Sequence, residues 1–232
     1  MERTAQKTGE QIDRDRFRKR LLKYTRKAFK LLPELDKPRI LDVGCGSGVP
    51  TIELARLSNG IVVGIDIDQS LLDKLNRKIV RECLSDRVET RKCSMFELDF
   101  PDESFEIIWV EGAVQAIGFE EGLKEWRRLL KPDGFLVVHD EIRTVPSNLE
   151  KTPGFGYELR DHFSLPVDAW WIEYYRPLEN RIKELTERYN DNFEALKMLE
   201  KVQKEIDMVK RHPEEYTSAF YIMQKTESLR VM

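Results

Sequence analysis

Strand-like and helix-like segments alternate between residues 39 and 139, and this alternation constrains the fold more than any other feature of the chain. Short runs rich in Val, Ile and Phe are typical of buried strands, and the intervening segments place apolar residues at helical spacing. Alternation of this kind indicates βαβ units around a parallel sheet with helices on both faces. The expected strands are 39–43, 61–66, 88–93, 105–110 and 135–139, the expected helices are 50–57, 71–83 and 119–130, and Lys131 to Gly134 is expected as a turn.

The remaining segments continue the α/β pattern at both ends. Residues 157–163 and 220–225 are predicted as two further strands, and the insert 165–218 between them carries two apolar stripes at helical spacing. Pro177 must begin or kink the first helix of the insert. A helix over 15–32 has a strongly basic outer face, for which a solvated surface and an anion-binding surface are both possible, and we favour the solvated surface.

Composition narrows the classes of function. The 232 residues carry a net charge of only -3, so no overall field requires a nucleic acid or membrane partner. Neither an apolar leader with a cleavage site nor a run long enough to span a bilayer is visible, and we expect a cytoplasmic protein. The spacing of Cys45, Cys83 and Cys93 fits neither a zinc site nor a disulfide framework, so free thiols and no metal are expected.

A glycine-rich loop joins the first expected strand to the first expected helix. Such a loop lets backbone approach a ligand closely, although it also serves as a simple tight turn. The glycines Gly44, Gly46 and Gly48 follow a G-x-G-x-G pattern, whereas dinucleotide sites use G-x-G-x-x-G. Asp42 would repel a pyrophosphate and attract an ammonium group. The loop therefore favours a nucleoside that carries an amino acid over a dinucleotide.

Four segments in order resemble the motifs of the class I S-adenosylmethionine-dependent methyltransferases: LDVGCGSG, GIDID, LDFPDESFEIIWVEGA and LLKPDGFLVV. The resemblance is specific over about residues 39–140. It implies a Rossmann-like, mostly parallel sheet of seven strands, the last of them antiparallel, with S-adenosylmethionine as cofactor and S-adenosylhomocysteine as its product. We expect one domain over 1–232, composed of a helical cover (1–38), a cofactor-binding core (39–140) and a helical insert or cap (165–218).

The expected cofactor site lies at the carboxyl ends of the strands. Asp66 ends the second strand, where a carboxylate can accept hydrogen bonds from two ribose hydroxyls, and Ile67 would cover the adenine. Relatives commonly carry an acidic residue after the third strand, where this chain has Ser94, a departure that leaves the hydroxyl and the Met95 amide to meet the adenine. The cofactor-binding set is Asp42, Gly44, Cys45, Gly46, Gly48, Asp66, Ile67, Ser94, Met95 and Val110.

Glu111 is the candidate catalytic residue. Its carboxylate follows the fourth strand, where it could position or deprotonate an acceptor, or could equally cap the next helix. Neither His139 nor His162 is assigned as a base, because a lone histidine is more often structural. The expected substrate pocket consists of Gln115, Asp140, Trp171 and Tyr175.

The predicted function is methyl transfer to a small-molecule acceptor by in-line displacement. An RNA methyltransferase and a non-catalytic S-adenosylmethionine-binding module are the alternatives, although the chain lacks the Asn/Asp-Pro-Pro-aromatic motif of many base-amino methyltransferases. Four aromatic residues within six positions, from Trp170 to Tyr175, indicate that the insert caps the acceptor pocket. The alternative is that part of this cluster forms a homodimer contact. The acceptor and its reacting atom are not determined by the sequence.

Overall fold

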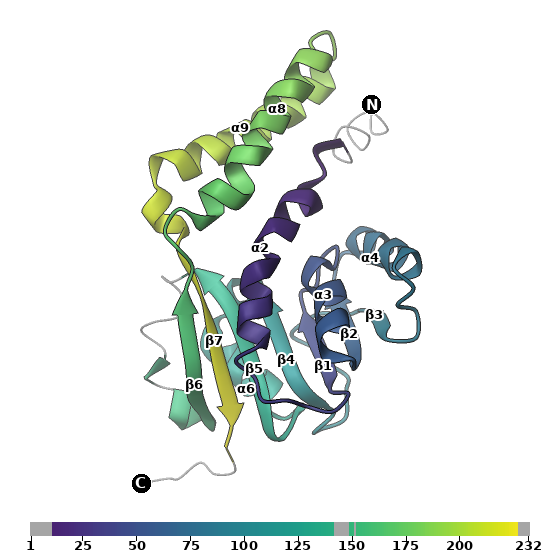
Figure 1. The fold of residues 1–232 in the computed structure, drawn as a ribbon, viewed down its shortest axis with the longest axis vertical. Helices are drawn as coiled ribbons and strands as arrows, with labels where there is room; N and C mark the ends of the chain where they lie inside the picture. The colour runs from purple at the N-terminus through teal and green to yellow at the C-terminus, as the bar shows by residue number, and fades with distance from the viewer. Residues whose placement is uncertain (1–10, 142–148, 151, 227–232) are drawn as a thin grey trace. The chain divides into compact units, whose positions relative to one another are not determined.

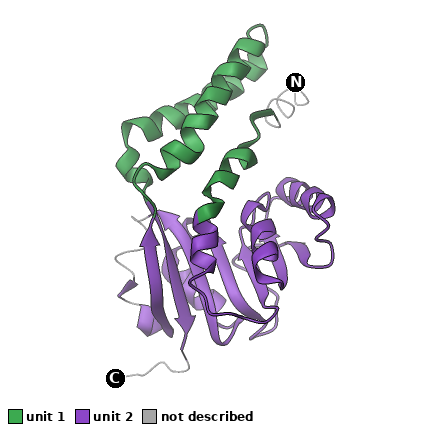
Figure 2. Cartoon of the chain, viewed as in Figure 1, with its two compact units in different colours: residues 1–23, 165–217 green, residues 24–164, 218–232 purple. Residues whose placement is uncertain are grey.

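The computed structural model describes residues 11–141, 149–150 and 152–226 (Figure 1). The chain divides into two compact units (Figure 2). The sheet unit comprises Tyr24–Ser164 and Ser218–Met232, and the helical unit comprises Met1–Lys23 and Leu165–Thr217. The division falls inside helix α2 (Arg14–Phe29), and each unit is described by itself.

Seven strands form one sheet in the order β3-β2-β1-β4-β5-β7-β6. The strands β1 to β5 pair in parallel, and β7 runs antiparallel to both β5 and β6. This confirms the predicted Rossmann-like sheet and its antiparallel last strand. The strands are β1 (Arg39–Val43), β2 (Ile61–Asp66), β3 (Val88–Lys92), β4 (Phe105–Glu111), β5 (Leu130–Glu141), β6 (Tyr157–Ser164) and β7 (Ser218–Lys225).

Helices cover both faces of the sheet, with α3 in front of it and α6 behind it in Figure 1. Alternating residues of β4 show the two layers: Val110 belongs to the apolar cluster that contains Trp126 of α6, whereas Trp109 faces Phe29 of α2, with ring centroids 6.3 Å apart. Both faces are therefore closed around buried strands. The helices of this unit are α3 (Val49–Ser58), α4 (Gln69–Arg81), α5 (Val114–Ile117) and α6 (Phe119–Arg127), with a 3-10 turn at Thr152–Phe155.

One local expectation, the turn between the fourth and fifth strands, is corrected. The turn predicted at Lys131 to Gly134 lies inside β5, but it leaves the ladder: Phe105 pairs with Leu130 and Ile107 with Phe135, so these residues bulge out of the strand. The positive φ of Asp133, 59°, accompanies the bulge. Helix α4 is capped by Asp68, whose carboxylate accepts a hydrogen bond from the Ser70 amide.

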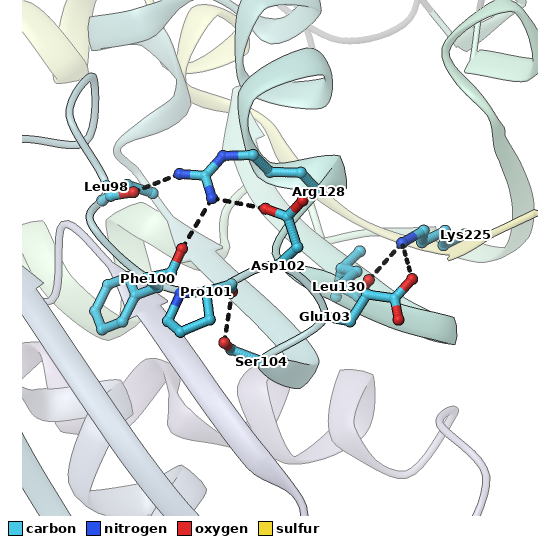
Figure 3. Close-up of polar contacts among 9 residues, drawn as sticks. All are labelled: Leu98, Phe100, Pro101, Asp102, Glu103, Ser104, Arg128, Leu130 and Lys225. Atoms are coloured by element: carbon cyan, nitrogen blue, oxygen red, sulfur yellow. Dashed lines mark hydrogen bonds and ion pairs between the residues drawn. The ribbon is translucent and has the colours of Figure 1, made fainter.

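The loop before β4 is clamped at the opposite edge of the sheet from the glycine loop (Figure 3). The Arg128 guanidinium donates to the carbonyls of Leu98 and Phe100 and pairs with Asp102 at 3.0 Å. Lys225 of β7 donates to the carbonyl of Leu130. The motif LDFPDES therefore positions the start of β4 through two backbone carbonyls and the side chain of Asp102.

The helical unit contains η3 (Trp171–Tyr175), α8 (Arg176–Arg188), α9 (Phe193–Arg211) and η4 (Pro213–Tyr216), together with the first part of α2. Pro177 lies in the first turn of α8, as predicted, while the aromatic segment before it forms a π-helical turn that the sequence did not indicate. A groove of about 830 Å³ lies between α8 and α9, with Ile182 and Leu199 among its lining residues. None of the helices within the described ranges is long and apolar enough to cross a membrane.

The basic face of α2 is largely exposed, as the sequence predicts, although some of its side chains also form ion pairs. In the helical unit Arg14 makes two hydrogen bonds to Glu205, at 3.0 and 2.6 Å, and Glu173 of the π-helical turn pairs with Lys23 at 2.6 Å and with Arg20 at 3.1 Å. These hydrogen bonds from Lys23 and Arg20 hold the pKa of the Glu173 carboxyl below its usual range. Ion pairs of the basic face thus hold the first part of α2 against the rest of the helical unit.

Candidate functional site

The glycine loop lies at the carboxyl end of β1 and is held by β2. The Cys45 amide donates to the carbonyl of Ile65 at 2.9 Å, and the Gly46 amide donates to Asp66 Oδ2 at 2.8 Å. The other Asp66 oxygen accepts from the Asp68 amide at 2.8 Å. Asp66 therefore fixes the loop with one oxygen and the start of α4 with the other, and each oxygen retains a second lone pair for a ligand hydroxyl.

Gly46 forms an open cradle in this loop. Its φ is +54°, and a Cβ placed there would have no atom within 4 Å. At Gly48, by contrast, φ is +78° and a Cβ would lie 2.2 Å from the side chain of the buried Leu75. Gly48 is thus required by packing, whereas the space in front of Gly46 is available to a ligand.

Asp42 and Cys45 are buried beneath the loop. Asp42 accepts a hydrogen bond from the Thr51 hydroxyl at 2.6 Å, which joins β1 to α3. Burial, with the nearby carboxylates of Asp42 and Asp66, raises the pKa of the Cys45 thiol far above its usual range. Cys45 is therefore a neutral packing residue, in agreement with the expectation of a free thiol.

Two large apolar side chains are exposed where β2 and β3 end. Ile67 is 72% exposed and Phe96 is 56% exposed. Ser94 and Met95 lie between β3 and Phe96, and the Ser94 hydroxyl accepts from the Phe96 amide at 3.2 Å. Phe96 is not among the site residues that the sequence predicts. The feature that could have identified Phe96 is an aromatic residue soon after a strand end, next to Ser94 and Met95, which were already assigned to the site.

Glu111 lies at the end of β4 with a side chain that is only 9% exposed and that accepts several hydrogen bonds, and its structure corrects the helix-capping alternative. Its Oε1 accepts from Thr25 at 3.0 Å and from the Trp109 indole at 2.8 Å, while its Oε2 lies 3.8 Å from His139 Nδ1. His139 in turn hydrogen-bonds Ser218 through Nε2 at 3.0 Å. Helix α5 begins without a side-chain cap. The catalytic role of Glu111 stays a prediction.

Gln115 and Asp140, both assigned to the substrate pocket, are in contact. Gln115 Nε2 donates to Asp140 Oδ1 at 2.9 Å, and the Glu141 amide donates to the same oxygen at 2.7 Å. Asp140 is 4% exposed, and its Oδ2 has no hydrogen-bond partner among the described residues. The two residues lie close to the glycine loop, because Ala113 at the start of α5 packs against Gly44.

Trp171 and Tyr175 belong to the helical unit and are half-buried within it. The Lys210 ammonium lies 5.1 Å from the Trp171 ring centroid, and Tyr175 contacts Trp170, Tyr174 and Tyr216 edge-on or tilted. Burial raises the pKa of the Tyr175 hydroxyl. Their assignment to the substrate pocket stays a prediction.

The residues at this edge fit an adenosine-type cofactor. The open cradle at Gly46 supplies space for the ligand. The carboxylate of Asp66, at the end of the neighbouring strand, supplies acceptors for the ribose, and the exposed apolar surface of Ile67 supplies a cover for a flat ring. The Asp66 carboxylate at the end of β2 suits vicinal hydroxyls and would repel a phosphate. The set of acceptors therefore fits a nucleoside whose ribose hydroxyls are free.

Comparison with known proteins agrees with this geometry. Residues 40–134 match the sequence model of a family described as "Methyltransferase domain". The chain is 30% identical over 118 residues to 27-O-demethylrifamycin SV methyltransferase of Amycolatopsis mediterranei, a match that covers 50% of this chain and 43% of that protein. It is 34% identical over 107 residues to sterol 24-C-methyltransferase erg6 of Aspergillus fumigatus, covering 46% of this chain and 28% of that protein. The chain thus spans less than half the length of these relatives.

A solved structure extends the likeness of fold beyond the cofactor core. A Geobacter sulfurreducens methyltransferase in complex with S-adenosylhomocysteine has a TM-score of 0.67 at 19% identity, covering 89% of this chain and 90% of that one. The enzyme class and cofactor predicted from the sequence, a methyltransferase that uses S-adenosylmethionine, are those of the matched family. Residues 40–134 therefore match the methyltransferase-domain family, and the fold of the described chain is that of a solved S-adenosylmethionine-dependent methyltransferase.

Proposed function

We propose that the chain transfers a methyl group from S-adenosylmethionine to a small-molecule acceptor by in-line displacement. The observation that carries the proposal is the open cradle at Gly46 next to Asp66, at the carboxyl edge of the sheet and inside the matched domain. The two curated relatives are named for methylation of a rifamycin and of a sterol, which supports a small molecule as the acceptor class.

Cofactor binding is assigned to residues at the ends of four strands. Asp66 would hold the ribose, Ile67 and the exposed Phe96 would flank the adenine, and Ser94 with the Met95 amide would meet its polar edge. The backbone at Val110 would face the methionine part. The remaining members of the predicted set are Gly44, Cys45, Gly46 and Gly48 in the loop itself and Asp42 on β1 below it. When bound, S-adenosylmethionine supplies an electrophilic methyl group on a sulfonium centre.

The work of the protein is to align the acceptor with that methyl group. Alignment of two held reactants can lower a barrier by roughly 7–11 kcal/mol, and a base is needed only where the acceptor must lose a proton. Glu111 is proposed to position or deprotonate the acceptor, and the insert 165–218 is proposed to cover the acceptor through Trp171 and Tyr175, which would exclude water. A homodimer contact through this insert and a cytoplasmic location stay predictions.

Two experiments test the proposal against its alternatives. Calorimetry should detect micromolar binding of S-adenosylhomocysteine and no binding of NAD, because the loop spacing and Asp42 disfavour a pyrophosphate. Methyl transfer from radiolabelled S-adenosylmethionine should then label small molecules and not RNA. Labelled RNA would establish the RNA methyltransferase alternative, and binding without any transfer would establish a non-catalytic module.

A further inference from the structure

We infer that Asp140 holds the acceptor through an N–H or O–H group, so that the acceptor is a compound that carries an amine or a hydroxyl group. This inference rests on the proposed function and names the substrate class of the same site. Its basis is the unpaired Oδ2 of a buried carboxylate at the carboxyl edge of the sheet.

The burial of Asp140 makes the unpaired oxygen costly. The side chain belongs to a residue that is 4% exposed, and buried polar atoms without a hydrogen bond are rare because each loses its interaction with water. Both hydrogen bonds that Asp140 accepts, from Gln115 and from the Glu141 amide, go to Oδ1. The carboxylate is thus oriented by one oxygen while the other is left for a donor that the described chain does not provide.

The location of Asp140 connects this oxygen to the cofactor loop. Gln115 lies on α5, the helix that starts next to Ala113, and the Ala113 methyl group packs against Gly44. Ligands of open α/β sheets bind at this carboxyl edge. A donor group that reaches Asp140 Oδ2 would therefore lie near the loop that is proposed to hold the cofactor.

The neighbouring acid, Glu111, is less suited to bind a donor group of the acceptor. Its carboxylate already accepts from Thr25 and Trp109 and lies beside His139. Strand alternation also places the two acids on opposite faces of the sheet, because Glu111 is paired with His139, the residue before Asp140. An acceptor held on the Asp140 face is recognised by Asp140 and Gln115.

The test compares Asp140→Asn and Asp140→Ala with Asp161→Asn in the full chain. Asp161 is a matched control: it is exposed on β6, and its Oδ1 accepts from the following backbone amide at 2.7 Å, as Asp140 Oδ1 does. The probes are S-adenosylhomocysteine for the cofactor site and a panel of hydroxyl, amine, thioether and alkene compounds as acceptors of a radiolabelled methyl group. The hydroxyl and amine members distinguish the two donor classes.

We expect only the hydroxyl or amine compounds to be methylated, with KM for the acceptor raised about tenfold to a hundredfold in Asp140→Asn, since a hydrogen bond to a charged group is lost. The affinity for S-adenosylhomocysteine should change by less than about threefold. Asp161→Asn should match the parent chain in every respect. Equal methylation of a thioether or alkene that carries neither group, or an unchanged KM, would overturn the inference while leaving the proposed function intact.

Thermal unfolding provides a readout that needs no acceptor. If Asp140 is kept for recognition, Asp140→Asn should leave Tm nearly unchanged, because it keeps the accepting Oδ1 and exchanges one unpaired polar atom for another. A fall in Tm would show that the carboxylate serves the fold instead, which would refute the inference. Failure of the parent chain to bind S-adenosylhomocysteine would refute the proposed function separately.

Discussion

Substitution of Gly46 separates ligand binding from folding more cleanly than any other change in the loop. A Cβ at Gly46 meets no atom within 4 Å, so Gly46→Ala adds only the strain of a left-handed conformation, about 1–2 kcal/mol. For a chain of this length that corresponds to a loss of about 2–8 °C in Tm. In Gly46→Leu the longer side chain would fill the cradle, and binding of S-adenosylhomocysteine should be lost.

Gly48→Ala is the matched comparison, because its Cβ would lie 2.2 Å from Leu75 at a similar positive φ. Overpacking typically adds about 1–3 kcal/mol to the strain, so this variant should unfold well below Gly46→Ala. The assay is thermal unfolding with and without S-adenosylhomocysteine, followed by calorimetry on the folded variants. Ligand at about a hundred times its dissociation constant should stabilise the parent chain by about 2.7 kcal/mol. If Gly46→Leu binds as tightly as the parent chain, the cradle is not the cofactor site.

Four further outcomes are expected. Asp66→Ala should weaken S-adenosylhomocysteine binding by about tenfold to a hundredfold in calorimetry, through loss of charge-assisted hydrogen bonds, whereas Asp68→Ala should cost about 1 kcal/mol of stability and leave binding intact. Glu111→Ala should lower the free energy of unfolding in urea by about 1–3 kcal/mol, because Thr25 and Trp109 lose their acceptor; an unchanged value would contradict this role of Glu111. The lowered pKa of Glu173 means that its ion pairs stabilise the fold above its unfolded pKa and that this contribution is lost as pH falls, so Glu173→Gln should flatten the stability profile between about pH 5 and 3. Trp171→Ala should raise acceptor KM without changing cofactor affinity; loss of an oligomer with unchanged kinetics would instead favour an assembly role for the insert.

The strands were predictable because burial on both faces leaves a strong pattern. The strand Ile61–Asp66 was placed at its observed bounds from a run of apolar residues that ends in a polar one. The segment Lys131 to Gly134 was misread because Pro and Gly indicate a turn, and a bulge inside a strand uses the same residues. The local sequence indicates a change of chain direction. Whether the strand continues beyond it depends on pairing with the neighbouring strand, which the local sequence does not contain.

The candidate site was predictable where the chain itself brings residues together. The loop from Gly44 to Gly48 is local, and Asp66 follows from the end of the adjacent strand. The contact between Gln115 and Asp140 joins residues 25 positions apart, and that between Thr25 and Glu111 joins residues 86 apart, so neither could be read from spacing. The aromatic cluster from Trp170 was noticed, but its π-helical backbone depends on a hydrogen-bond pattern that composition does not determine.

The register of β4 and β5 divides the two acids of this edge between different tasks. Glu111 and His139 are paired across the strands and share a face, on which Thr25, Trp109 and Ser218 complete a network that links α2 to the sheet. Removal of Glu111 would leave those donors unpaired, so its contribution to stability is large whatever it does in the reaction. Asp140 lies on the other face with one oxygen unpaired, so it costs stability in the absence of a ligand. An oxygen that the described chain leaves unpaired is better explained by what it binds than by what it supports, and this difference makes Asp140 the stronger candidate for contact with the acceptor.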